Sequence, residues 1–197
     1  MTSDYPLSPF RIDDRAKMHE LVDNYPLATI ISGRGEPENI TLVPLIRRDI
    51  GPDSTRLAGH VDRDNPHCAE LRTGEPVSFV FRGPESYASP DVYPDAQLPG
   101  WLYLMLKGRG TVHRLDDVAT RRLLIDATRE LGDEDQHFAL DPVDPRIDQF
   151  IGGIVAFEID VTEMSGITKL AQDKGPVHSE LARNHLTSRA GQHMINP

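Results

Sequence analysis

The sequence has little cysteine, few aromatic residues and no long hydrophobic segment. Its single cysteine, Cys68, excludes a disulfide within the chain and is typical of a protein of the reducing cytoplasm. The apolar runs are much shorter than the roughly 20 residues that a membrane-spanning helix needs. The N-terminus also lacks the basic and apolar regions of a signal peptide. We therefore expect a soluble cytoplasmic protein with no membrane partner.

Positive charge is scarce as well. The chain has 21 Lys and Arg residues against 31 Asp and Glu residues, so its formal net charge is −10. A protein that binds nucleic acid directly needs a basic face. The nearest candidates, Arg47–Arg48 and Arg121–Arg122, are isolated pairs. We therefore do not expect this protein to bind nucleic acid directly.

Segments rich in β-branched and aromatic residues predict a series of strands. They lie at residues 27–32, 40–46, 55–60, 77–82, 101–107, 110–114 and 154–161, where the fifth and sixth form either one long strand or a hairpin. Pro44 lies within the second segment, so we expect a sheet edge or a bulge there. Residues 83–100 contain four prolines and predict a long functional loop.

Helices are predicted between these strands. They lie at residues 11–23, 64–72, 118–131 and 177–188, and Asp116 is the expected N-cap of the third. The strands do not alternate regularly with helices, which favours a mostly antiparallel β-barrel with flanking helices. We assign this cofactor-binding barrel to residues 1–175 and a helical C-terminal tail to residues 176–197.

Four short motifs occur in a characteristic order along the chain. They are residues 59–66 (GHVDRDNP), 81–90 (FRGPESYASP), 99–103 (PGWLY, with Gly110 downstream) and 169–173 (KLAQD). In order and spacing the chain resembles the PaiB-like branch of the FMN-binding split-barrel superfamily. The resemblance implies a split β-barrel and a homodimer whose cofactor site lies near the subunit interface.

Three residues depart from the flavin-type members of that family. Leu102, Ala171 and Asp173 stand where Asn, Ser and Asn are usual. Each change removes or alters a polar group that would serve a flavin. One branch of the family, the piperazate synthases, has exchanged flavin for heme. The resemblance and its departures therefore make heme the first expectation for the cofactor, with FMN as the alternative.

The heme branch implies a particular reaction. It is the formation of an N–N bond that converts an N5-hydroxyornithine-type amino acid to piperazic acid, a step of antibiotic biosynthesis, with heme iron as Lewis acid. The flavin branch implies an FMN-binding oxidoreductase or a PaiB-like negative transcriptional regulator. Both readings stay open at the level of sequence.

Seven residues are candidates for cofactor binding. His60 is either an axial heme iron ligand or a histidine that supports a turn, since a neutral imidazole suits iron. Arg63 pairs either with a carboxylate or phosphate of a ligand, or with a neighbouring aspartate at the surface. Trp101 stacks on a planar ring or fills the core. The remaining candidates are the loop residues Tyr87, Ser89 and Tyr93, together with Gln172.

Three further residues are candidates for catalysis. Lys169, Asp173 and Lys174 form a polar cluster directly after the last predicted strand. Two lysines that flank a carboxylate suit proton transfer if burial shifts one pKa. The alternative is a charged surface turn.

Overall fold

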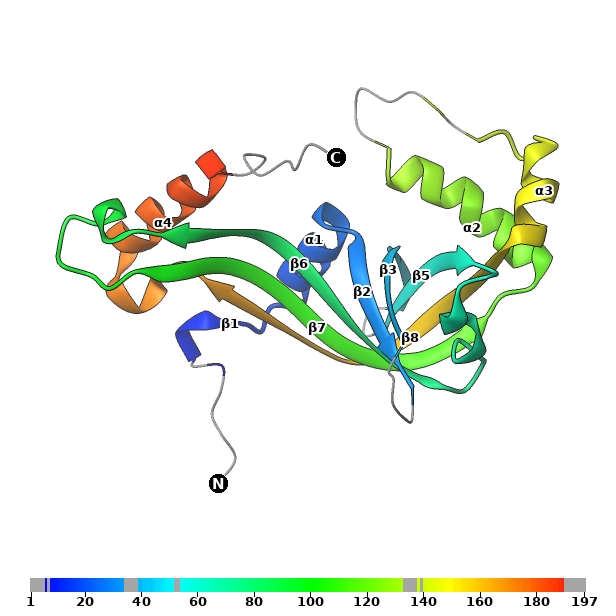
Figure 1. The fold of residues 1–197 in the computed structure, drawn as a ribbon, viewed down its shortest axis with the longest axis horizontal. Coiled ribbons are helices and arrows are strands. Elements are labelled where there is room, and N and C mark those ends of the chain that lie inside the picture. Colours follow the sequence, from blue (N-terminus) through cyan, green and yellow to red (C-terminus); the bar gives the residue numbers. More distant parts are fainter. Residues whose placement is uncertain are drawn as a thin grey trace. The chain divides into compact units, whose positions relative to one another are not determined.

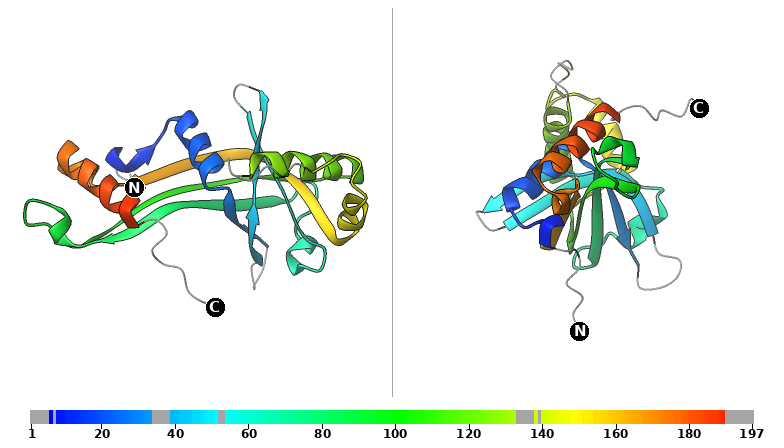
Figure 2. Two further views of the ribbon diagram at one scale, coloured as in Figure 1. Left: turned by 90° about the horizontal axis from the view of Figure 1, so that it is seen from above. Right: turned by 90° about the vertical axis from the view of Figure 1, so that its left-hand side faces the viewer.

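The computed structural model describes residues 6, 8–33, 39–51, 54–132, 138 and 140–189. The chain forms two compact units (Figures 1 and 2). Unit 1 consists of Met1–Met18, Arg82–Leu106 and Ser165–Pro197, and unit 2 consists of His19–Phe81 and Lys107–Met164. Within the described residues, no helix is long and apolar enough to cross a membrane.

The described residues contain eight strands, four α-helices and four short 3-10 helices. The strands are β1 (Arg11–Ile12), β2 (Leu27–Ser32), β3 (Asn39–Pro44), β4 (Ile46–Gly51), β5 (Ser54–Asp62), β6 (Pro76–Ala88), β7 (Gly100–Arg114) and β8 (Ile154–Lys169). The α-helices are α1 (Arg15–Asn24), α2 (Asp117–Glu130), α3 (Arg146–Gly153) and α4 (Pro176–Arg189). The 3-10 helices are η1 (Ser8–Phe10), η2 (Pro66–Ala69), η3 (Pro90–Val92) and η4 (Gln172–Lys174).

The strands form one sheet with the order β3-β2-β6-β7-β8-β5-β4, and β1 pairs with β8 (Figure 1). The pairs β2–β3, β2–β6, β4–β5 and β5–β8 are all antiparallel. Strands β6, β7 and β8 contribute residues to both units. The fold class predicted from the sequence, mostly antiparallel β with flanking helices, is confirmed.

Several element predictions are also confirmed. Strand β2 covers the predicted segment, and β7 is one long strand and not a hairpin. Pro44 ends β3, which lies at one end of the strand order, as its missing N–H requires. The side chain of Asp116 accepts a hydrogen bond from the backbone N–H of Ala119 and caps α2. Helix α4 is present in the predicted C-terminal tail; the boundary at residue 175 stays a prediction.

Other predictions were wrong in extent. The expected loop at residues 83–100 is shorter, because β6 continues to Ala88 with alternating burial and buries Ser86 and Ala88. The expected helix at 64–72 is the short η2, capped by the side chain of Asn65. The helix expected from residue 11 begins at Arg15, and α3 was not predicted.

Each unit has its own apolar core. In unit 2, alternate residues of β6 face inward, and the rings of Phe79 and Phe81 meet edge to face with centroids 5.8 Å apart. In unit 1, the residues Ala88, Leu102, Leu170, Ala182 and Leu186 form a cluster that joins α4 to strands β6 and β7. This second cluster matters for function, since it fixes the elements that surround a cavity.

Candidate functional site

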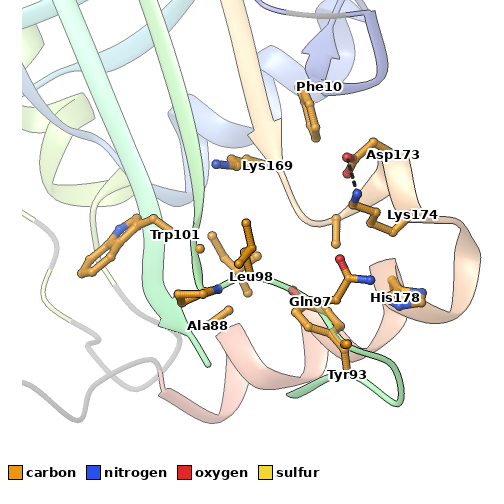
Figure 3. Close-up of a pocket in the computed structure, with 15 residues that line it drawn as sticks. Phe10, Ala88, Tyr93, Gln97, Leu98, Trp101, Lys169, Asp173, Lys174 and His178 are labelled. Carbon is orange, nitrogen blue, oxygen red and sulfur yellow. Dashed lines mark ion pairs between the residues drawn. The ribbon is translucent and has the colours of Figure 1, made fainter. Parts of the chain in front are cut away.

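A cavity of about 350 Å³ opens in unit 1, and we refer to it as pocket 1 (Figure 3). Its size lies within the range of small-molecule sites. Every residue that lines it belongs to unit 1: Phe10, Ala88, Tyr93, Ala96, Gln97, Leu98, Pro99, Gly100, Trp101, Leu102, Lys169, Ala171, Asp173, Lys174 and His178. Five of the ten residues predicted from the sequence are among them.

The aromatic wall of pocket 1 comes largely from the loop before β7 and from its first residues. Trp101 is about half exposed, and its ring lies tilted against that of Tyr87, with centroids 6.4 Å apart. The next residue, Leu102, is buried in the core of unit 1. Leu102, which replaces the usual Asn of flavin-type members, therefore supplies apolar packing at this wall.

The cationic side of pocket 1 follows the end of β8. Lys169 is half-buried and has no hydrogen-bond or ion-pair partner within the described part of the chain. Lys174 lies on η4, where its Nζ is 3.8 Å from a carboxylate oxygen of Asp173. The carboxylate offsets one cation, so Lys169 is the side chain with positive charge left to bind an anion.

Gln172 holds the turn between these residues. Its Oε1 accepts a hydrogen bond from the backbone N–H of Leu170 at 2.7 Å, and its Nε2 donates to the carbonyl of Thr168 at 2.7 Å. Ala171 takes a left-handed conformation there, with φ of 56°. Both side-chain groups of Gln172 are thus engaged with the backbone, and the residue does not line pocket 1. Its predicted role in cofactor binding stays a prediction.

His178 also lines pocket 1, and it is paired with a carboxylate that the sequence did not suggest. Nε2 of His178, in the first turn of α4, lies 2.6 Å from Oδ1 of Asp95. The ring of His178 stacks on that of Tyr93, with centroids 5.3 Å apart and planes 24° apart. The hydrogen bond from His178 lowers the pKa of Asp95, and burial, followed by the negative charge of Asp173, raises the pKa of Tyr93.

The other two loop residues have local roles. The side chain of Ser89 is the N-cap of η3, where its Oγ donates to a carboxylate oxygen of Asp91 at 3.1 Å. Tyr87 is about half exposed, and its carbonyl accepts a hydrogen bond from Nε2 of His185 at 2.9 Å. Neither residue lines pocket 1.

His60 and Arg63 belong to unit 2, whereas the other eight predicted residues belong to unit 1. His60 pairs with Ala156 of β8 and keeps an exposed side chain that has no partner in the described residues. The surrounding protein atoms still remove enough water to lower its pKa. The lowered pKa favours the neutral imidazole, which is the form that binds a metal ion.

Arg63 is engaged by the end of α3. Its Nε donates to the carbonyl of Gly152 at 2.7 Å, and its Nη2 donates to that of Ile154 at 2.9 Å. The guanidinium thus binds backbone carbonyls in this conformation. A role toward a ligand carboxylate stays a prediction.

A second cavity, of about 530 Å³, lies in unit 2 and contains none of the predicted residues. It is lined mainly by hydroxyl and charged side chains, among them Ser32, Thr162, Glu70 and Arg109. Arg109 and Glu163, which both line it, form an ion pair. Pocket 1 remains the candidate site, since it combines aromatic side chains with Lys169, a cation that has no partner among the described residues, and with His178.

Comparison with known proteins identifies the family. Residues 5–163 match the family model described as "Putative FMN-binding domain", so the chain belongs to that family. No curated protein matches the chain.

Two solved structures share the fold. One is the FAD and heme binding protein from Mycobacterium smegmatis, with a TM-score of 0.60 and 17% identity over 81% of this chain and 73% of that one. The other is the flavocytochrome Anf3 from Azotobacter vinelandii, with a TM-score of 0.61 and 14% identity over 81% of this chain and 69% of that one. These similarities show the split-barrel fold.

The residues of pocket 1 fit the group that the family implies. FMN joins a planar aromatic ring to a phosphate, and the pocket offers aromatic side chains together with Lys169 and Lys174. His60 separately offers one nitrogen donor that suits heme iron. Within the described residues, no cluster of three or more His, Cys, Asp and Glu side chains forms a metal site of another kind.

Proposed function

We propose that the protein is a flavin-dependent oxidoreductase that holds FMN at pocket 1. The observation that carries this proposal is the presence, in one cavity, of an aromatic wall, of Lys169, which has no partner among the described residues, and of His178, which pairs with Asp95. The family supports FMN as the cofactor. A bound flavin supplies hydride and electron transfer, while the protein supplies binding, orientation and electrostatics.

The pocket residues divide these tasks. Trp101 offers a face on which a planar ring stacks, because its side chain is not buried in the core. Lys169 binds the phosphate or another anionic group as a point charge. Leu102, which is buried in the core of unit 1, excludes water from the apolar part of the pocket.

An absorption spectrum and an FMN titration test this proposal. We expect the purified protein to carry or take up FMN, with two broad flavin bands. Lys169→Gln should weaken FMN binding about tenfold, which corresponds to about 1.4 kcal/mol. Lys107→Gln is the matched control, because Lys107 is an exposed lysine of β7 that does not line the pocket. A protein that binds no FMN, or equal losses in both variants, would contradict the proposal.

A second candidate is a heme-dependent enzyme of the piperazate synthase type, and His60 is the observation that favours it. This imidazole is exposed and without a partner in the described residues, and its lowered pKa favours the neutral form. Two proteins of the same fold are described as heme-binding or as a flavocytochrome, which supports the candidate. Bound heme iron would supply Lewis acidity.

In this second candidate the substrate is an N5-hydroxyornithine-type amino acid. Its own α-amine attacks N5, so a pocket that keeps the substrate folded contributes much of the rate through proximity. Lys169 and the Asp173–Lys174 pair hold and move the protons that leave the amine and join the departing water.

The spectrum of His60→Ala separates the two candidates. In the heme candidate, reconstitution with hemin gives a sharp Soret band in the wild type, and His60→Ala loses it or shifts it. His113→Ala is the control, because His113 is another partly exposed histidine on a strand of unit 2. An unchanged ligand spectrum in His60→Ala rules out this residue as the axial ligand.

We further propose that the partner of this chain is a second copy of itself. Strands β2 and β3 carry an outer apolar face made of Leu27, Ile31, Ile40 and Leu42. Ile31 pairs with Ile40 across the ladder, and Leu27, Ile40 and Leu42 are each more than half exposed. Such a face favours burial against another protein surface. A two-fold axis would place the same face on both sides of an interface, as in most homodimers.

A further inference from the structure

Pocket 1 contains a histidine whose orientation is fixed by two neighbours. Nε2 of His178 is 2.6 Å from Asp95, and Asp95 also accepts a hydrogen bond from Nε2 of Gln97 at 2.8 Å. The ring of His178 lies against that of Tyr93. Gln97, Tyr93 and His178 lie together on one side of the pocket in Figure 3. These contacts leave the imidazole little freedom to rotate.

The contact with Asp95 also decides where the proton of His178 lies. An ionised carboxylate only accepts hydrogen bonds, so Nε2 carries the proton. Nδ1 is then the nitrogen with a free lone pair. Within the part of the chain that the structure describes, no side chain or backbone group bonds to Nδ1. The side chain is only 14% exposed, and it lines the pocket.

We propose that His178 accepts a proton at Nδ1 from a ligand held in pocket 1 and returns it, and that Asp95 is the positioning residue for this transfer. The proton leaves an O–H or N–H bond of the ligand, whose electron pair stays on the ligand as an anion. Asp95 stabilises the imidazolium that forms, and Lys169 stabilises the anion. The proposal rests on the use of pocket 1 as a ligand site.

This arrangement also defines the chemical class of the ligand. A group with a proton that a histidine can remove is a weak acid, such as a phenol-like or enol-like hydroxyl or an acidic ring N–H. The charged and titratable groups around His178 in unit 1 are Tyr93, Asp95, Lys169, Asp173 and Lys174. Asp173 is adjacent to Lys174, so Lys169, which has no partner among the described residues, favours the anionic form of the ligand.

The first test measures the tautomer of His178 in the ligand-free protein by long-range ¹H–¹⁵N NMR. We expect the proton on Nε2 in the wild type and a mixture of tautomers in Asp95→Ala. Asp91→Ala is the matched control, since Asp91 lies in η3, just before this loop, and contacts Ser89 but not His178. A proton on Nδ1 in the wild type, or the same tautomer in Asp95→Ala, overturns the role of Asp95.

The second test measures proton transfer directly with 4-nitrophenol, whose anion absorbs visible light. We expect the pKa of the bound phenol to fall by about one unit or more in the wild type, and to return toward its solution value in His178→Gln. Failure to bind the phenol, or equal pKa values in both proteins, overturns the inference. An FMN titration of the same samples tests the proposed function separately. A protein that binds FMN but does not ionise the phenol would contradict the role of His178 and leave the proposed function standing.

Discussion

At the scale of single residues, His67 shows how a buried polar group shapes stability. It is fully buried in unit 2, where Nε2 lies 2.6 Å from Oγ of Ser32 and Nδ1 lies 2.9 Å from Oγ1 of Thr41. Each hydroxyl can donate or accept, so the neutral ring is satisfied on both sides. Burial lowers the pKa of His67.

This pKa shift predicts a loss of stability in acid. Below pH 6.5 the unfolded chain binds a proton on His67 while the folded protein does not, so the free energy of unfolding falls as the pH drops from 6.5 toward the lowered folded pKa. The slope from one such group is at most about 1.4 kcal/mol per pH unit. His67→Gln should therefore show a weaker dependence, measured by urea unfolding between pH 5.5 and 7.5.

A control separates this effect from lost packing. Ser32→Ala removes one partner of His67 but keeps the titrating ring, so it should lower stability by about 1–3 kcal/mol and retain the acid dependence. If the free energy of unfolding depends equally on pH in the wild type and in His67→Gln, groups other than His67 dominate this dependence. His60, whose pKa is also lowered, contributes in the same direction in both proteins.

Site residues that follow one another closely in the sequence could be predicted. A contact between two residues that lie far apart in the sequence could not. Lys169, Asp173 and Lys174 follow one strand, and the structure places all three at pocket 1. Asp95 and His178 are 83 residues apart, and they meet only because the start of α4 lies near the loop after η3. No periodicity or spacing in the sequence connects them. The Leu102 departure was visible in the sequence, but its burial was not.

At the scale of elements, the sequence predicted where strands begin better than where they end. Gly83 and Pro84 favour a turn, yet both lie within β6, because pairing in the sheet outweighs local preference. The alternating burial of Ser86 and Ala88 continues the pattern of the strand. Helix α3 escaped prediction, since residues 146–153 are short and follow a proline-rich, acidic stretch.

Strand β7 gives a prediction at this scale. A Cβ atom at Gly108 would lie 2.4 Å from the carbonyl oxygen of Glu163 and 2.4 Å from the ring of Phe79, so strand packing there admits only glycine. Gly108→Ala should therefore lower the free energy of unfolding by about 1–3 kcal/mol. Gly100→Ala, at the start of the same strand, has no atom within 4 Å of the new Cβ.

Denaturant unfolding of the two variants checks this prediction. Gly100→Ala should stay within about 0.5 kcal/mol of the wild type. Equal stability of Gly108→Ala and Gly100→Ala would mean that Phe79 and β8 move aside at little cost. Both are glycine-to-alanine changes in one strand, so the comparison isolates the steric effect from β propensity.

At the scale of the whole molecule, the order of the four motifs predicted the fold. It did not predict how the candidate site residues are divided between the two units. The motif at residues 59–66 lies in unit 2, whereas those at 99–103 and 169–173 lie in unit 1. Order along a chain cannot say which motifs share a cavity, because that depends on the sheet order. Pocket 1 joins the last two motifs with residues of η1 and α4 that belong to neither.

The outer apolar face of β2 and β3 gives the last prediction, which concerns assembly. If a second copy covers this face, a charged side chain introduced in the middle of the face loses its water and gains no partner. The dimer should then dissociate. Leu42→Glu is therefore expected to give a monomer at concentrations where the wild type is a dimer, as measured by sedimentation equilibrium. Leu42 is 65% exposed and lies on the edge strand β3, so the change should leave the fold of unit 2 intact.

Val118→Glu is the control for this experiment, since Val118 is 80% exposed and lies on α2, which carries none of the residues of the outer apolar face. It should leave the dimer unchanged, because the new charge stays in water. A wild type that is already monomeric would contradict the homodimer, and a dimeric Leu42→Glu would mean that another surface forms it. FMN or hemin binding measured on the same samples tests whether the cofactor site needs the second copy. A monomer that still binds the cofactor with wild-type affinity would show that the residues of one chain are sufficient.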